Sequence, residues 1–283
     1  MAPTKMNGSM KKRLAKVRGF VFDIDGTLAL TDRATRGHRA LPGASGLLAE
    51  LRARGTRFAA YTNGTLHTPR HTAASLRGAG LDLRDEELLT PASVAADYFV
   101  AKRLRRVLVL GGEGVWGPLR EAGIDVVVSP ENSEGLDAVL VGWHPRFGFD
   151  DLDAACKAVW AGAKLYTVSN APYFATTEGR SLGVSGAISA AITSVTRKRA
   201  LVLGKPSTLG LRTAARLLGL KASELAVVGD DPGLEMAMAR AGGALAIAVQ
   251  TGLLDAKTLG ALPAKQKPHL VLNGVAELLL HYG

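Results

Sequence analysis

The chain has 283 residues, of which 47% are hydrophobic, so it can form a large core and is excluded from the disordered class. Its formal charge of +10 would suit an anionic small substrate, nucleic acid or a membrane surface, but most basic residues are scattered, and only residues 11–18 are densely basic. No aromatic residues lie within that stretch. A solvated surface therefore explains it better than a nucleic-acid face does, and we do not expect nucleic acid as a partner.

Cysteine usage and hydropathy indicate the compartment. The single cysteine, Cys156, excludes an internal disulfide framework and a cysteine zinc site. No apolar run reaches the roughly 18 residues that span a bilayer, and the basic residues 10–18 precede a strand-like run instead of a signal-peptide core. We therefore expect no membrane association and a cytoplasmic location.

Short runs rich in Val, Leu and Ala alternate with helical patterns and glycine-containing turns, which predicts an α/β fold. Residues 1–10 are polar, and we expect them to be flexible. The first elements are a strand (17–23), a loop, a helix (44–55), a strand (57–62) and a helix (68–78). They form a βαβ unit.

A second series predicts a separate, smaller α/β layer. It contains strands at 105–112, 125–128, 137–143 and 164–170 and a helix at 150–161. The third series has helices at 186–195, 207–219 and 232–243 and strands at 200–205, 224–231 and 244–249, which we expect to rejoin the first sheet. The prediction is a doubly wound, parallel-sheet core (11–92 and 186–283) with an inserted α/β domain (93–185).

The stretch FVFDIDGTL (20–28) ends a strand on two carboxylates, Asp23 and Asp25. In an open parallel sheet, ligands bind beyond the carboxyl ends of the strands, so polar groups that follow other strands are expected nearby. These groups are Thr62, Asn63, Lys205, Asp230 and Asp231. Several carboxylates and one ammonium suit a divalent cation with a phosphate, and hard oxygen ligands favour Mg²⁺. Such a cation would neutralise the repulsion between the aspartates.

Each of these stretches also has an ordinary structural explanation. GKP (204–206) is a common turn with a surface lysine, and TNG (62–64) is usually a turn. In GDD (229–231), Asp230 or Asp231 could be the N-cap of the next helix. Their occurrence at successive strand ends favours the catalytic interpretation.

Taken in order, DIDGT (23–27), YTNGT (61–65), GKP and GDD resemble the four motifs of the haloacid dehalogenase superfamily. The resemblance implies that Asp23 is a nucleophile that forms an aspartyl-phosphate, and that Asp25 is the general acid and base. It further implies that Thr62 and the backbone amides of Asn63 and Gly64 bind the phosphoryl oxygens.

The same resemblance assigns the remaining charged residues. Lys205 would offset negative charge on the nucleophile and the phosphoryl group. Mg²⁺ would be held by Asp23, Asp230 and the main-chain carbonyl of Asp25. The likeness extends over most of residues 17–255.

Motif spacing locates the insertion. Asp23 and Thr62 are 39 residues apart, which leaves no room for an extra domain, whereas 143 residues separate Thr62 from Lys205. The chain is similar in this respect to the branch that includes 4-nitrophenyl, phosphoglycolate and pyridoxal phosphate phosphatases. Relatives in that branch often dimerise through the inserted domain, so the resemblance also implies a homodimer.

Two departures from the branch affect the predicted site. The fourth motif has Asp231, Gly233 and Glu235. We therefore expect Glu235 and Asp231 to contact the water molecules around the cation and not the cation itself. In the inserted domain Asn170 is retained, and Trp143 and His144 either border the substrate or are a packed Trp and a surface His.

The predicted function is a Mg²⁺-dependent phosphatase that acts on a small phosphorylated metabolite. The departures motivate one alternative, a related phosphate-binding or regulatory protein with weak turnover. A phosphate-release screen with and without Mg²⁺ distinguishes the two.

Overall fold

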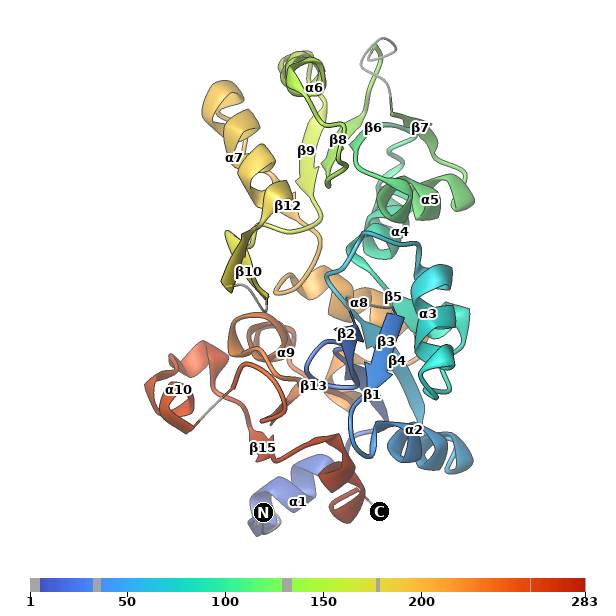
Figure 1. Ribbon diagram of the computed structural model, residues 1–283, viewed down its shortest axis with the longest axis vertical. Helices are drawn as coiled ribbons and strands as arrows, with labels where there is room; N and C mark the ends of the chain where they lie inside the picture. Colours follow the sequence, from blue (N-terminus) through green and yellow to red (C-terminus); the bar gives the residue numbers. More distant parts are fainter. Residues whose placement is uncertain (1–5, 33–36, 129–133, 177–178, 255, 283) are drawn as a thin grey trace. The chain divides into compact units, whose positions relative to one another are not determined.

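The computed structural model describes residues 6–32, 37–128, 134–176, 179–254 and 256–282 (Figure 1). The chain divides into two compact units. Unit 1 comprises Met1–Thr62, Arg70–Leu89 and Pro206–Gly283, and unit 2 comprises Asn63–Pro69 and Thr90–Lys205. The domain ranges 11–92, 186–283 and 93–185 stay a prediction.

Unit 1 is built on a parallel sheet with the strand order β15-β14-β13-β1-β4-β5. Its strands are β1 (Gly19–Phe22), β4 (Arg57–Tyr61), β5 (Leu88–Leu89), β13 (Leu225–Gly229), β14 (Leu245–Val249) and β15 (Leu270–Leu272). Every residue of β1, β13 and β14 is buried, because helices cover both faces of a parallel sheet.

The described helices of unit 1 are short, with at most ten residues each. The α-helices are α1 (Gly8–Leu14), α2 (Ala44–Ala53), α3 (Pro69–Gly78), α8 (Thr208–Leu217), α9 (Ala237–Gly242) and α10 (Ala256–Ala261). The shorter turns are η1 (Asp85–Glu87), η3 (Ala222–Glu224), η5 (Ala264–Gln266), η6 (Val275–Leu280) and the π-helical η4 (Pro232–Met236). The predicted helix 232–243 is thus a π-turn followed by α9.

Tyr282, near the C-terminal end of the described chain, packs beside β1. The Tyr282 ring packs edge-on against Phe20 at a centroid distance of 4.8 Å, and its hydroxyl donates to the Val17 carbonyl at 3.3 Å. Of the predicted flexible residues 1–10, residues 1–5 lie outside the described residues, whereas Gly8–Met10 begin α1 and Met6 and Met10 pack on the core.

An antiparallel hairpin, β2 (Ala29–Asp32) and β3 (Gly37–Ala40), occupies part of the loop predicted after Asp23. Sequence patterns did not indicate it, because each strand has four residues and the pair shows no apolar alternation over a longer run. The residues that join the two strands lie outside the described residues.

Unit 2 contains a second parallel sheet with the order β12-β9-β8-β6-β7. Its strands are β6 (Arg106–Leu110), β7 (Asp125–Val127), β8 (Ala138–Val141), β9 (Lys164–Thr167) and β12 (Leu201–Val202). A separate antiparallel hairpin is formed by β10 (Tyr173–Thr176) and β11 (Gly179–Leu182). The helices are α4 (Pro91–Lys102), α5 (Glu113–Glu121), α6 (Phe149–Trp160) and α7 (Val184–Thr196).

One topological expectation was wrong. The strand predicted at 200–205 does not rejoin the first sheet, because Leu201 pairs with Tyr166 and Val202 with Thr167 at the edge of the second sheet. The preceding helix α7 packs on α6 and β9, which leads the chain to this edge. The predicted class is nevertheless confirmed: an α/β fold with a Rossmann-like core sheet and an inserted parallel sheet.

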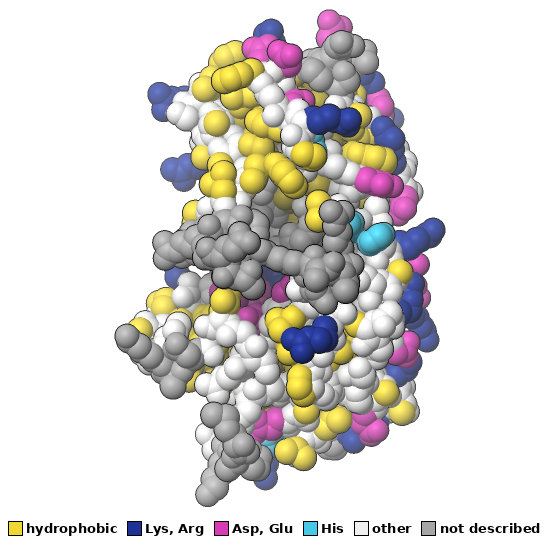
Figure 2. All heavy atoms as spheres, viewed as in Figure 1, with side chains coloured by type: hydrophobic (Ala, Val, Ile, Leu, Met, Phe, Trp, Pro, Cys, Tyr) yellow, Lys and Arg dark blue, Asp and Glu magenta, His cyan; other side chains and the backbone are white. Residues whose placement is uncertain are grey.

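The surface of unit 2 exposes several large apolar side chains (Figure 2). Phe149 and Trp160 at the two ends of α6 are 89% and 60% exposed, and Val195 of α7 is 53% exposed. Cys156 is buried in α6, as expected, and burial raises the pKa of its thiol. Within the described ranges, none of the helices combines the length and apolarity needed to cross a bilayer.

Candidate functional site

The carboxyl edge of the first sheet carries three predicted residues. Phe22 of β1 lies level with Val228 of β13 and Ala60 of β4. Asp23, Thr62 and Asp230 follow these parallel strands and are 7%, 8% and 5% exposed. Strand register therefore brings two buried carboxylates and a hydroxyl to one edge of unit 1.

Asp25 is held by a residue that the sequence did not single out. Its Oδ1 accepts hydrogen bonds from the Thr31 amide at 3.1 Å and the Thr31 hydroxyl at 2.7 Å. Gly26 has a φ of +82° and donates its amide to the Ala29 carbonyl at 2.9 Å, which turns the chain into β2. The unpredicted hairpin thus orients the exposed Asp25 carboxylate.

Asp230 is fixed by the loop that follows β14. Its Oδ2 accepts from the Leu253 amide at 2.8 Å, and Thr251 Oγ1 donates to the Gly26 carbonyl at 2.6 Å. A Cβ at Gly26 would lie 2.5 Å from Asp230 Oδ2, and a Cβ at Gly252 would overlap the same oxygen. The backbone therefore surrounds this carboxylate at two positions where a side chain would displace it.

Asp231 and Glu235 organise the turn that begins at Pro232. Asp231 Oδ1 accepts from the Gly233 amide at 2.7 Å, so it is the N-cap that the structural explanation predicted. Glu235 is 2% exposed, and its Oε2 accepts from the Asp231 amide at 3.0 Å. Their outer-shell role toward a cation stays a prediction.

The donor set of unit 1 fits magnesium better than a softer metal. Asp23 and Asp230 offer buried carboxylates and Asp25 offers a main-chain carbonyl, which are hard oxygen donors. Among the residues described, no three or more His, Cys, Asp or Glu side chains form a metal cage. Mg²⁺ does not need one, since it keeps several waters and binds through one or two carboxylates.

Lys205 and Asn63 belong to unit 2 and are joined by two hydrogen bonds. Asn63 Oδ1 accepts from the Lys205 amide at 2.8 Å, and Asn63 Nδ2 donates to the Lys205 carbonyl at 3.0 Å. A Cβ at Gly204 would lie 2.7 Å from Asn63 Oδ1, so glycine permits this approach. Lys205 is only 2% exposed, so it is not the surface lysine that the ordinary structural explanation expects. Lysine is almost never fully buried unless its charge is paired.

This Asn63–Lys205 clamp lies where the chain passes between the units, at Thr62/Asn63 and at Lys205/Pro206. From the sequence, we predicted only that the backbone amide of Asn63 binds the phosphoryl oxygens. The side-chain role joins residues 142 positions apart, so no local pattern could have indicated it.

The remaining predicted residues lie in unit 2. Gly64 and Asn170 are exposed. His144 is partly buried, with Nε2 3.9 Å from Asp151 Oδ2, and its ring lies 6.3 Å from the Phe147 ring. Trp143 is 42% exposed, which is evidence against the packed tryptophan, one of the two alternatives that the sequence left open.

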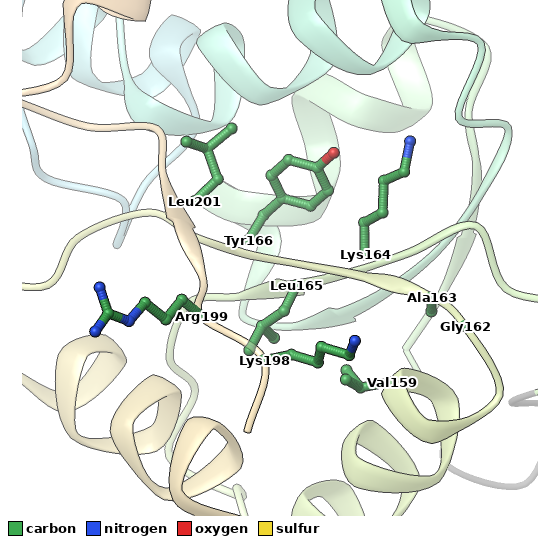
Figure 3. A pocket seen from close by; sticks show the side chains of 9 residues that line it. All are labelled: Val159, Gly162, Ala163, Lys164, Leu165, Tyr166, Lys198, Arg199 and Leu201. Carbon is green, nitrogen blue, oxygen red and sulfur yellow. The ribbon is translucent and has the colours of Figure 1, made fainter. Parts of the chain in front are cut away.

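Unit 2 also contains a hollow of about 370 Å³ near the end of α6 (Figure 3). It is lined by Val159, Gly162, Ala163, Lys164, Leu165, Tyr166, Lys198, Arg199 and Leu201. Burial, and then the neighbouring Tyr98, raises the pKa of Tyr166 to about 12. No predicted site residue lines this hollow.

Comparison with known proteins is consistent with this geometry. Residues 20–125 match the family described as haloacid dehalogenase-like hydrolase, and residues 202–278 match a second model of HAD-hydrolase-like proteins. The sugar-phosphatase AraL of Bacillus subtilis is 29% identical over 235 residues, which cover 83% of each chain.

Two solved structures show the same architecture. The p-nitrophenyl phosphatase from Archaeoglobus fulgidus superposes with a TM-score of 0.83 at 25% identity, covering 93% of this chain and 98% of that one. Glycerol phosphate phosphatase from Mycobacterium tuberculosis, solved with magnesium, gives 0.81 at 26% identity, covering 94% and 77%.

The chain belongs to the haloacid dehalogenase-like hydrolases. Within that family it is a phosphatase, a phosphoric monoester hydrolase, of the NagD and p-nitrophenyl phosphatase type.

Proposed function

We propose that this protein is a Mg²⁺-dependent phosphatase that hydrolyses small phosphate monoesters through an aspartyl-phosphate. The observation that carries the proposal is the register of β1, β4 and β13, which aligns buried Asp23 and Asp230 with Thr62 at one sheet edge. Buried carboxylates at the ligand-binding edge of a parallel sheet are costly unless they are hydrogen-bonded, paired with a positive charge or bound to a cation, and a catalytic cation would supply such a partner.

The reaction is proposed to take place in two displacements. A carboxylate oxygen of Asp23 attacks phosphorus, and the bond between phosphorus and the ester oxygen breaks. Asp25 protonates the leaving oxygen, which departs as an alcohol. Asp25 then takes a proton from a water that attacks the aspartyl-phosphate, releasing inorganic phosphate and restoring Asp23.

Other groups position the phosphoryl group and balance its charge. The Thr62 hydroxyl and the amides of Asn63 and Gly64 would donate to its oxygens, and the Lys205 ammonium would offset their charge. Asp23, Asp230 and the Asp25 carbonyl would hold Mg²⁺. A bound Mg²⁺ supplies charge neutralisation that lets an anionic nucleophile approach an anionic ester.

The relatives favour a small, polar substrate. Their names describe a sugar phosphatase, a dihydroxyacetone phosphatase and a glycerol phosphate phosphatase. We propose a sugar or polyol phosphate, with unit 2 selecting the leaving group and Asn170 and His144 as its candidate contacts.

Phosphate release from a panel of sugar, polyol, nucleotide and pyridoxal phosphates tests the function. At least one ester should be hydrolysed with Mg²⁺ and none when EDTA is present, and Asp23→Asn should release none. Tight binding of an ester without metal-dependent release would support the alternative, a phosphate-binding protein.

We also propose a homodimer formed through unit 2. The exposed Phe149, Trp160 and Val195 on α6 and α7 support it, because exposed large apolar side chains often mark interfaces. Light scattering should give twice the mass of 29.6 kDa, and Trp160→Glu should shift it toward the monomer. A monomer in the unmodified protein would contradict the proposal.

A further inference from the structure

Two arginines converge on a histidine in unit 1. Arg13 lies in the last turn of α1, Arg240 lies in α9, and His269 immediately precedes β15. Arg13 Nη2 lies 3.2 Å from His269 Nε2, and Arg240 Nη1 lies 2.6 Å from the same atom. Elements that are distant in the sequence thus bring two guanidinium groups to the same imidazole nitrogen.

The hydrogen-bond donors at this point outnumber the acceptors. The Ala246 amide donates to His269 Nδ1 at 2.9 Å, so the lone pair of a neutral imidazole is on Nδ1 and its proton is on Nε2. Arginine has only donors and stays protonated. Among the described residues, no acceptor is hydrogen-bonded to the Nε2–H group or to the two guanidiniums that face it.

Acidic side chains in the described ranges do not neutralise the two arginines. Neither Arg13 nor Arg240 forms a salt bridge with an acidic side chain that the structure describes. Further basic residues are close to the cluster in the sequence, namely Lys11, Lys12 and Lys16 at α1 and Lys265 and Lys267 at or just after η5. Burial, then Arg13 and Arg240, lowers the pKa of His269 to about 4, so the imidazole is neutral at physiological pH.

A solvated basic helix end is the simpler interpretation, since cations stabilise the C-terminus of α1. It accounts for Lys11 and Lys12, which can extend into water. It does not account for two guanidiniums within hydrogen-bonding distance of a nitrogen that cannot accept from them.

We propose that Arg13, Arg240 and His269 form a binding site for a small oxyanion, such as sulfate, a phosphate or a carboxylate. Its oxygens would accept from both guanidiniums and from Nε2–H, which supplies the missing acceptors. Because β15 is parallel to the other strands and His269 precedes it, the site lies at the amino edge of the sheet, opposite the edge that carries Asp23 and Asp230. It is therefore distinct from the phosphatase site.

Sulfate is a suitable probe because it is not a phosphatase substrate. Sodium sulfate is titrated against sodium chloride of equal ionic strength while the imidazole resonances of His269 are followed by NMR. We expect a saturable shift with sulfate and none with chloride. Asp23→Asn should give the same shift, which separates this site from sulfate bound at the catalytic edge.

Variants locate the site. Arg13→Gln combined with Arg240→Gln should weaken sulfate binding at least about tenfold, because charge-assisted hydrogen bonds are lost. Lys16→Gln, which removes one charge from the same basic stretch, should retain wild-type affinity. Thermal unfolding checks that both variants fold, and the wild-type titration decides the question without any substitution.

Three results would overturn the inference. The first is a His269 resonance that does not saturate with sulfate, and the second is equal affinity in the double variant and Lys16→Gln. The third is a His269 shift with a short DNA duplex but not with sulfate, which would assign the cluster to nucleic acid.

Discussion

The two sheets of this protein have similar backbones and different chemistry at their strand ends. Both are parallel and have buried central strands, but β1 and β13 of the first sheet are followed by Asp23 and Asp230. In the second sheet, β6 and β8 are followed by Gly111 and Gly142, which pack closely against Val115. Parallel α/β topology creates a ligand-binding edge in both cases, and the side chains that follow the strands decide whether it can perform catalysis.

The carboxylates of the two sheets also have different partners. In the second sheet Asp137, before β8, accepts from the amides of Arg105 at 2.6 Å and Arg106 at 3.0 Å. This carboxylate completes hydrogen bonds of the neighbouring strand, so its role is structural. Asp23, by contrast, follows its strand at the edge where ligands bind.

The largest expected effect tests this difference directly. Asp23→Asn should lower kcat by at least about 10³-fold, because an amide cannot replace the nucleophile. Asp137→Asn is the matched control and should leave kcat unchanged. A steady-state phosphate assay measures both, and equal activity of Asp23→Asn and the wild type would disprove the assignment.

Gly252→Ala should have the next largest effect. The added Cβ would displace the Asp230 carboxylate, and misplacement of a reacting group by about 1 Å can cost on the order of 100-fold. Activity should fall about 10- to 100-fold, with a higher Mg²⁺ requirement. Gly46→Ala in α2, where no atom lies within 4 Å, should stay fully active; if both variants are equally active, the proposed role of Asp230 is wrong.

Asn63→Ala should reduce kcat about 10- to 30-fold. It removes both hydrogen bonds to the Lys205 main chain, each worth about 1 kcal/mol, and 1.4 kcal/mol corresponds to a factor of ten in rate. Ser185→Ala, which removes a 3.2 Å bond to the Ser169 carbonyl in the same unit, is the control. Identical kcat values in the two variants would show that the clamp does not position Lys205.

Asp137→Asn should affect stability and not activity. The Arg106 and Arg105 amides lower the pKa of Asp137 below its ordinary 3.8, so its ionised form stabilises the fold above that pH. The variant should unfold about 1 kcal/mol more easily at pH 7, a value limited by solvent screening. In urea unfolding, this difference should shrink as the pH falls below 3.8; a constant difference would contradict the prediction.

The smallest effect is expected at alkaline pH. Because the pKa of Tyr166 is raised to about 12 from 10.0, its neutral form stabilises the fold below pH 10, and this contribution is lost as the pH rises through 12. Because phenylalanine cannot ionise, the Tyr166→Phe variant should lose less folding stability than the wild type as the pH rises from 10 to about 12. Thermal melts between pH 9 and about 12 measure it, and parallel pH profiles of the two proteins would contradict it.

The sequence predicted the strands that carry the motifs, because their apolar runs end abruptly on polar residues. Asp23, Thr62 and Asp230 follow β1, β4 and β13 as expected. It also predicted an insertion between Thr62 and Lys205, where motif spacing leaves far more chain than one crossover needs.

The contacts that orient these residues could not be predicted. Thr31 reaches Asp25 through a hairpin of four-residue strands, and Thr251 bonds to Gly26 across 225 positions. The two-residue strand β12 is placed by packing of α7 and not by its own pattern. Short strands and long-range side-chain bonds leave no periodic signal for a sequence to show.

The most direct test of the account is the identity of the phosphorylated residue. The enzyme is mixed with Mg²⁺ and an ester that it hydrolyses, and the reaction is quenched in acid. Borohydride then reduces an aspartyl-phosphate to homoserine, and the peptides are sequenced by mass spectrometry. Homoserine at position 23, dependent on Mg²⁺, is the predicted result. Modification at Asp25, Asp230 or Asp231 instead, or turnover without any modified aspartate, would contradict it.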